Sequence, residues 1–284
     1  MEMVSEKYHI HITSQRKWYD LNLKEVWDYR DLIILFTQRN FTVRYKQTIL
    51  GPLWIILTPF LTSFIYTFVF GYVAGMSTDG VPHILFYMVS HALWEYFADC
   101  LNRNATTFTA NAGIFGKVYF PRLVTPISNV LSSIIQFGIQ ISMAFGVLIF
   151  YLVKGEVSPC WSAWLLLPIV IIHLGLLGVG FGLIISSMTT KYRDLTVLIG
   201  FGVSLWMYAT PVVYPLSQLG EGALKTLILI NPVTGPMEIF RFAVIGRGTV
   251  IPEFVLLSVL TTAMLDFIGV VIFNQVEKTF MDTV

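Results

Sequence analysis

Long apolar runs recur along almost the whole chain after residue 49, and they constrain the fold more than any other feature. A helix needs about 20 mostly apolar residues to cross a bilayer. Runs of this kind fall at roughly 50–75, 124–153, 162–188, 195–216 and 253–274. Charged residues make up only 12% of the 284-residue chain, whereas soluble domains carry about 25%. We therefore predict an all-α integral membrane protein.

A sixth candidate span, at roughly 83–101, is weaker because it carries His91, Glu95 and Asp99. It is long enough to cross the membrane if these side chains face protein rather than lipid. The three groups are compatible with a proton relay, with a buried polar network or with a water-accessible helix end.

The distribution of Lys and Arg supports six spans. With all six, the connections on one side carry 14 of the 18 Lys and Arg residues, and those on the other side carry 4. The side rich in Lys and Arg is cytoplasmic. Omitting the 83–101 span would destroy this alternation. We therefore predict a cytoplasmic N-terminal segment at 1–49, a six-span domain at 50–284 and two cytoplasmic termini.

Two segments outside the spans have helical apolar spacing. In the N-terminal segment this spacing predicts an amphipathic helix on the cytoplasmic membrane surface, although a soluble cytoplasmic helix is the alternative. Its apolar positions are Leu21, Val26, Leu32, Leu35 and Phe36. On the outer side, the 217–252 segment predicts two short re-entrant helices separated by a turn at Asn231-Pro232.

The sequence contains none of the common motifs for ATP hydrolysis, metal binding or ion filtering. The nearest approach to a P-loop, at 111–118, has Asn111 in place of the first glycine and Val118 in place of Ser or Thr. There is no H-E-x-x-H, no G-x-S-x-G and no Cys/His cluster. We therefore expect no catalytic residue, no metal and no cofactor on this chain.

Several spans carry small or polar residues on one face. The first span has Thr58, Thr62, Tyr66 and Phe70 at four-residue spacing, and the fifth has Ser204 and Tyr208. Hydroxyls and aromatic rings suit sugars, but packing between helices and an interfacial aromatic belt are the alternatives. The third span carries polar residues that we interpret as packing contacts, namely Asn129, Ser133, Gln136 and Gln140. The fourth span carries glycines that allow close helix approach, namely Gly175, Gly178 and Gly182.

Four sequence segments resemble segments of one protein family and occur in the same order as in that family. They are "WDYRDLIILFTQRNFTVRYKQT" at 27–48, "RYKQTILGPLWIILTPFL" at 44–61, "NAGIFGKVYFPRLVTP" at 111–126 and "NPVTGPMEIFRFAVIG" at 231–246. Together they resemble the permease subunits of polysaccharide-exporting ABC transporters of the type 2 exporter class. The resemblance covers almost the whole chain.

The resemblance implies a homodimer in the cytoplasmic (inner) membrane of a bacterium, joined to two separate ATPase subunits that hold ATP and Mg. Such a complex exports lipid-linked polysaccharide, namely O-antigen, capsule or teichoic acid, with O-antigen favoured here. The channel would be lined by the first and fifth spans, and here by Thr58, Thr62, Tyr66, Phe70, Ser204 and Tyr208.

The resemblance also implies two cytoplasmic sites. The 111–122 connection would be a coupling helix that contacts the ATPase through Asn111, Phe115, Lys117, Tyr119, Pro121 and Arg122. The N-terminal helix would flank the entrance, where Arg39, Arg44 and Lys46 could attract a lipid pyrophosphate. For these three cations, anchoring by the positive-inside rule is the alternative.

Two other functions compete with export. One is a proton-coupled secondary transporter that uses His91, Glu95 and Asp99. The other is a membrane-embedded enzyme of lipid-linked glycans, for which the cytoplasmic loops offer no acidic catalytic pair.

Overall fold

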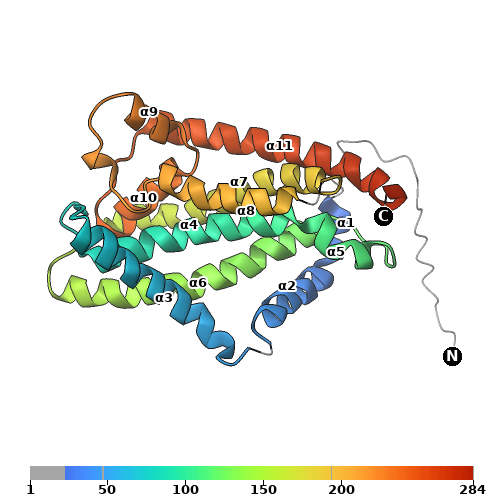
Figure 1. Cartoon of the computed structure of the whole chain (residues 1–284), viewed down its shortest axis with the longest axis horizontal. Coiled ribbons are helices and arrows are strands. Elements are labelled where there is room, and N and C mark those ends of the chain that lie inside the picture. Colours follow the sequence, from blue (N-terminus) through green and yellow to red (C-terminus); the bar gives the residue numbers. More distant parts are fainter. Residues whose placement is uncertain (1–22, 47, 193, 284) are drawn as a thin grey trace, which may run out of the picture.

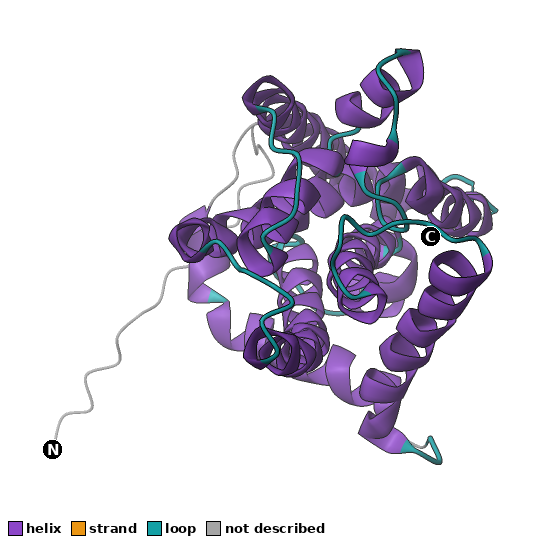
Figure 2. Cartoon of the chain, turned by 90° about the vertical axis from the view of Figure 1, so that its left-hand side faces the viewer, coloured by secondary structure: helices purple, strands orange, loops and turns teal. Residues whose placement is uncertain are grey.

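The computed structural model describes residues 23–46, 48–192 and 194–283, and in these ranges the regular structure is entirely helical. The long helices lie side by side along the longest axis of the molecule (Figure 1). Figure 2, turned by 90°, shows helices joined by loops and turns throughout the described ranges. The predicted all-α fold class is therefore confirmed. The predicted apolar position Leu21 lies outside the described residues.

The centre of the bundle is the pair α4 (His83–Ala105) and α7 (Leu167–Thr189). Helix α4 also packs against α3 (Trp54–Tyr66) and α6 (Val124–Val153), while α7 packs against α11 (Pro252–Thr283). In α4, 17 of the 23 residues are buried. This position explains why the 83–101 segment looked weak as a span, because a helix enclosed by protein does not need lipid-facing apolar residues on every side.

Glycines bring α7 close to α4. A Cβ atom added to Gly178 would lie 2.7 Å from the Cβ of Cys100, and one added to Gly182 would lie 2.4 Å from the Cβ of Asn104. A Cβ at Gly175 would lie 2.5 Å from the Tyr96 hydroxyl. The expected close approach through these glycines is confirmed.

Four helices are long and apolar enough to cross a membrane within the described residues. They are α3 with the π-helical segment η2 (Thr67–Val73), α6, the 3₁₀ segment η3 (Trp161–Leu166) with α7, and α11. Helix α8 (Leu195–Trp206), extended by η4 (Met207–Ala209), is apolar but shorter. The short 3₁₀ segments η1 (Gly51–Leu53) and η5 (Leu216–Gln218) complete the connections. Length and composition thus give four spans, or five if one bent pair is counted.

That bent pair consists of α9 (Ala223–Ile230) and α10 (Thr234–Ile245), which meet at 87°. The 217–252 segment thus contains two short helices, as predicted, and their re-entrant position at the outer side stays a prediction. Helix α10 buries an ion pair between Arg241 and Glu238. The Arg241 guanidinium also lies 4.9 Å from the centre of the Phe86 ring and donates to the carbonyl of Pro211 at 3.0 Å. These contacts attach α10 to α4 and to the turn after α8.

The N-terminal segment contains α1 (Leu23–Asp28) and α2 (Arg30–Tyr45), and α2 packs against α6. Ile33 and Phe36 are buried, whereas Leu35 is 58% exposed. The predicted contact of these apolar residues with the membrane surface stays a prediction. The helix turns Ile33 and Phe36 toward the bundle and leaves Leu35 on the opposite side, since residues two apart do not share a helix face.

Candidate functional site

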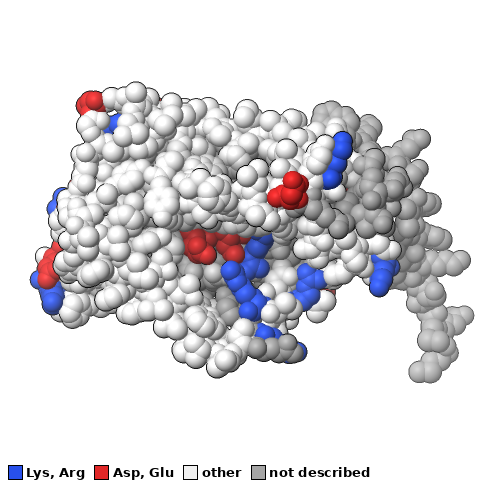
Figure 3. Space-filling model, in the orientation of Figure 1, with Lys and Arg blue, Asp and Glu red and all other residues white. Residues whose placement is uncertain are grey.

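Acidic and basic side chains meet in a hollow near the middle of the face shown in Figure 3, where α2 adjoins the bundle. Helix α4 supplies Glu95, Asp99 and Arg103, and α2 supplies Arg39 and Arg44. The hollow contains two neighbouring cavities, and Arg44 lines both.

The Asp99 carboxylate is the centre of the charged cluster. Arg44 donates from Nη1 to its Oδ1 at 3.1 Å, and Arg103 donates from Nε to its Oδ2 at 2.6 Å. The Ser133 hydroxyl donates to the same Oδ2 at 2.7 Å. Arg44 Nη1 also donates to Gln136 Oε1 at 2.5 Å. One carboxylate therefore joins α2, α4 and α6.

The network continues toward α5 (Thr107–Phe115). Arg39 donates to Asn111 Oδ1 at 3.2 Å and to Asn40 Oδ1 at 3.0 Å. Asn40 donates in turn to Asn129 Oδ1 at 3.0 Å. Partial burial lowers the pKa of Arg39, but a guanidinium remains charged in proteins. The N-terminal helix is thus attached to the bundle by charge and by amide hydrogen bonds.

We call the cavity nearer α5 the cationic cavity. Its volume is about 470 Å³, and it is lined by Arg39, Asn40, Val43, Arg44, Asp99, Arg103, Thr106, Ala110, Asn111 and Asn129. Three guanidinium groups face one carboxylate there. This excess of positive charge suits an anionic ligand.

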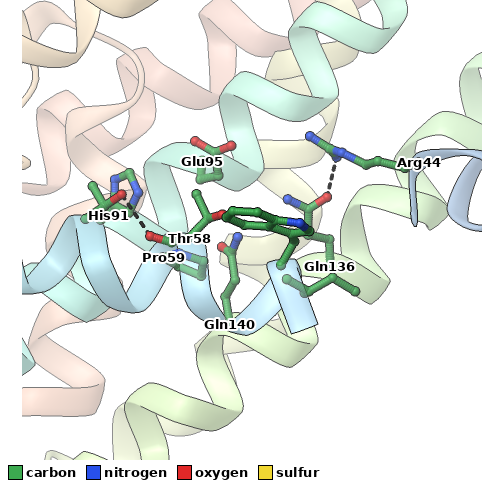
Figure 4. Close-up of a pocket in the computed structure, with 10 residues that line it drawn as sticks. Arg44, Thr58, Pro59, His91, Glu95, Gln136 and Gln140 are labelled. Atoms are coloured by element: carbon green, nitrogen blue, oxygen red, sulfur yellow. Dashed lines mark hydrogen bonds between the residues drawn. The ribbon is translucent and has the colours of Figure 1, made fainter. Parts of the chain in front are cut away.

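We call the second cavity the polar cavity. Its volume is about 360 Å³, and it is lined by Arg44, Trp54, Ile55, Thr58, Pro59, Thr62, His91, Glu95, Gln136 and Gln140. Figure 4 shows side chains from α3, α4 and α6 converging on it, with Arg44 reaching Gln136. Within the described residues, no three His, Cys, Asp or Glu side chains are grouped to hold a metal ion.

The structure separates the predicted channel residues into three groups. Thr58 and Thr62 line the polar cavity. Tyr66 and Phe70 are half-buried, and their rings pack edge-on or tilted against Tyr87 of α4. Ser204 and Tyr208, on α8 and η4, are exposed. The hydroxyl of Tyr66 lies 3.5 Å from the sulfur of Met207, so the first and fifth predicted spans adjoin.

The predicted coupling residues differ in their accessibility. The structure places the helix at Thr107–Phe115 and a turn after it, rather than one helix over 111–122. Asn111, Phe115 and Pro121 are buried within this chain, whereas Lys117 and Tyr119 are exposed on the turn. Thr107, Asn111 and Phe115 are four residues apart and share the buried face of α5. Asn111 and Phe115 therefore pack against the rest of the chain beneath the exposed turn.

Arg122 holds this turn in place. Its guanidinium lies 4.5 Å from the centre of the Phe115 ring, donates to the Phe115 carbonyl at 3.1 Å and lies 3.8 Å from a Glu277 carboxylate oxygen. Desolvation lowers the pKa of Arg122, and the nearby Glu277 opposes that shift. Arg122 therefore connects the turn to α11.

Of the predicted entrance residues, Arg39 and Arg44 line the cationic cavity, and Lys46 is exposed just after α2. Arg103 was not among the predicted site residues, although its four-residue separation from Asp99 is the spacing of a helical ion pair. Gln136 and Gln140, predicted to be packing contacts, both line the polar cavity.

Substituting Asp99 with asparagine is expected to loosen α2. The change leaves Arg44 and Arg103 without their shared carboxylate, and hydrogen bonds to charged groups contribute about 1.5–3 kcal/mol. Amide hydrogen exchange near Arg44 should therefore accelerate about tenfold or more. Glu156→Gln, at an exposed loop position, is the control. Equal exchange rates in α2 of both variants would contradict this role for Asp99.

These observations define a class of protein: an α-helical membrane protein in which an N-terminal helix adjoins a charged hollow between bundle helices. The chain belongs to the ABC-2 type transporter family, whose model matches residues 31–245. Membership makes it the membrane component of an ABC transporter and implies an ATPase partner.

Known relatives match most of the chain. It is 28% identical over 253 residues to the O-antigen export system permease protein RfbA of Klebsiella pneumoniae, covering 89% of this chain and 94% of that protein. It is 27% identical over 222 residues to the protein of the same name from Myxococcus xanthus, covering 77% of this chain and 82% of that protein.

Proposed function

We propose that this chain is the permease subunit of an ATP-driven exporter of lipid-linked polysaccharide, with O-antigen as the favoured substrate. The observation that carries the proposal is the match to O-antigen export permeases over 94% of a relative's length. A second copy of the chain and two ATPase subunits complete the complex, and ATP and Mg bind to those subunits. The comparisons do not favour a proton-coupled transporter.

The proposal places six spans in the bacterial inner membrane with both termini in the cytoplasm. These spans are α3–η2, α4, α6, η3–α7, α8–η4 and α11. The assignment of α4 as a membrane span is supported by its length of 23 residues and by its central position between α3, α6 and α7. The bent pair α9 and α10 then lies at the outer side as a re-entrant element.

In the proposed dimer, α3 and α8 of the two copies enclose the central channel. Phe64 and Ile65 on α3 are 58% and 55% exposed, and Phe201 on α8 is 63% exposed. The proposed channel uses Thr58, Thr62, Tyr66 and Phe70 from the first span together with Ser204 and Tyr208 from the fifth. Tyr208 is the most accessible aromatic ring of this set, at 54% exposure.

The turn after α5 is the proposed contact with the ATPase. It presents Lys117 and Tyr119 outward, while Arg122 fixes its base to Phe115. A rigid turn at the end of α4 and α5 could transmit a movement of the ATPase to the central helix of the bundle. The cationic cavity, with Arg39 and Arg44 and with Lys46 nearby, is the proposed entrance for the lipid pyrophosphate.

Reversing the charge on the turn tests the proposal. Lys117→Glu is expected to reduce polysaccharide export about tenfold or more, because coupling of ATPase motion to the spans would be lost. Surface polysaccharide and cytoplasmic lipid-linked polysaccharide are measured in cells that carry the chain and its ATPase. The same substitution at Lys154, exposed on the loop after α6, should leave export unchanged. Normal export with Lys117→Glu would contradict the coupling role, and export that persists without the chain would contradict the proposed function.

A further inference from the structure

The polar cavity is lined by polar side chains that lack hydrogen-bond partners among the described residues. Glu95 forms no hydrogen bond or ion pair with any described residue, although its carboxylate lines the cavity. His91 is 9% exposed, and its Nδ1 atom has no partner among the described residues. The Nδ1 atom is enclosed by protein, so the cavity reaches only the Glu95 carboxylate. An unpartnered carboxylate within a membrane-spanning helix is costly, so a ligand or water in the cavity must satisfy Glu95.

A purely structural polar network would have its members bonded to one another. Here the lining side chains make few such bonds. Gln136 accepts from Arg44, and the Thr62 hydroxyl donates to the carbonyl of Thr58 at 2.9 Å. The Gln140 amide makes no hydrogen bond within the described part of the chain. The cavity therefore presents free donors and acceptors from two helices, α4 and α6.

A proline-containing turn of α3 lines the same cavity. Pro59 lies inside α3 and has no N–H, so the carbonyl of Ile55 loses its usual helical donor. Both residues line the cavity, beside the Trp54 side chain. A volume of about 360 Å³ falls within the range of small-ligand pockets and equals roughly a dozen water molecules.

We infer that the polar cavity binds one sugar residue of the lipid-linked substrate, namely the sugar attached directly to phosphate. This inference rests on the proposed function. Each sugar hydroxyl both donates and accepts, which suits a carboxylate and an amide placed together. The indole of Trp54 offers an apolar surface to the C–H face of the ring. The cavity thus has the chemistry of a neutral polyhydroxyl site.

The position of Arg44 between the two cavities indicates which sugar of the substrate is bound. Its Nη1 atom contacts Gln136 of the polar cavity and Asp99 of the cationic cavity, so the two cavities share one guanidinium. A phosphate in the cationic cavity would take the place that Asp99 now holds beside Arg44 and Arg103. A sugar next to that phosphate then lies in the polar cavity. The pair of cavities matches a sugar–phosphate junction.

Binding measurements with two probes test the inference. The complex of this chain with its ATPase, in lipid nanodiscs, is titrated with polyprenyl diphosphate and with polyprenyl diphosphate bearing one hexose. The wild type should bind the hexose-bearing probe about tenfold more tightly, since a few net hydrogen bonds are gained. Glu95→Gln and Gln140→Met should each reduce this preference while keeping the affinity for the sugar-free probe. Gln218→Met, at an exposed position, is the matched control.

The sugar-free probe also reports whether each variant is folded, because its site lies in the cationic cavity. Arg39→Gln, which changes that cavity alone, should weaken both probes by the same factor. Equal wild-type affinity for the two probes would overturn the inference and leave the proposed export function intact. A preference that survives both Glu95→Gln and Gln140→Met would also overturn it. Failure of the wild type to bind either probe would contradict the proposed substrate itself.

Discussion

Substituting Gly182 with alanine is expected to destabilise the bundle by about 3 kcal/mol, the upper end of the usual range for overpacking. The added Cβ would lie 2.4 Å from the Cβ of Asn104, 2.9 Å from the carbonyl oxygen of Leu101 and 3.2 Å from the amide nitrogen of Ala105. Two of these atoms are backbone, so α4 and α7 must move apart. Because this pair is the centre of the fold, the thermal unfolding temperature of the purified protein should fall.

Gly200 provides a matched control in α8. A Cβ added there meets nothing within 4 Å, so Gly200→Ala introduces no clash. Alanine favours helix over glycine by about 1 kcal/mol, and Gly200→Ala should therefore be neutral or slightly stabilising. The two substitutions are chemically identical and differ in their surroundings. Equal unfolding temperatures for the two variants would show that α4 and α7 do not approach as closely as described.

The second large effect is expected at Glu238. Glu238→Gln keeps the shape of the side chain but leaves Arg241 charged and 1% exposed in α10. Removing one partner of a buried ion pair costs about 3–5 kcal/mol. The remaining amide also accepts less strongly from the backbone N–H of Thr249, now 2.7 Å from Glu238 Oε2. The unfolding temperature and the yield of membrane-inserted protein should both fall.

Two comparisons separate this effect from a general loss of charge. Glu221→Gln removes the carboxylate of an exposed pair with Lys225, where a cost within about 1 kcal/mol is expected. The double variant Glu238→Gln with Arg241→Met removes both buried charges and should recover most of the lost stability. If the double variant is no more stable than Glu238→Gln alone, the uncompensated charge of Arg241 is not the cause.

Local sequence patterns predicted the helices and some of their contacts. The glycine stripe at Gly175, Gly178 and Gly182 predicted a close helix contact, because a missing side chain has the same consequence in any tertiary setting. Which apolar side chains of α2 face the bundle was not predicted. Leu35 and Phe36 are neighbours in sequence, and the direction of the bundle, which no local pattern contains, decided that Phe36 is the buried one.

The apolar runs and the placement of Lys and Arg by themselves determined that this chain is a helical membrane protein, since both follow from transfer between water and lipid. The tertiary structure decided which polar residues act together. Glu95, Gln140 and Thr58 lie on three different helices, and only the packing of α3, α4 and α6 brings them to one cavity. The physical reason is that spacing along a helix fixes which residues share its face, whereas long-range packing fixes which faces meet.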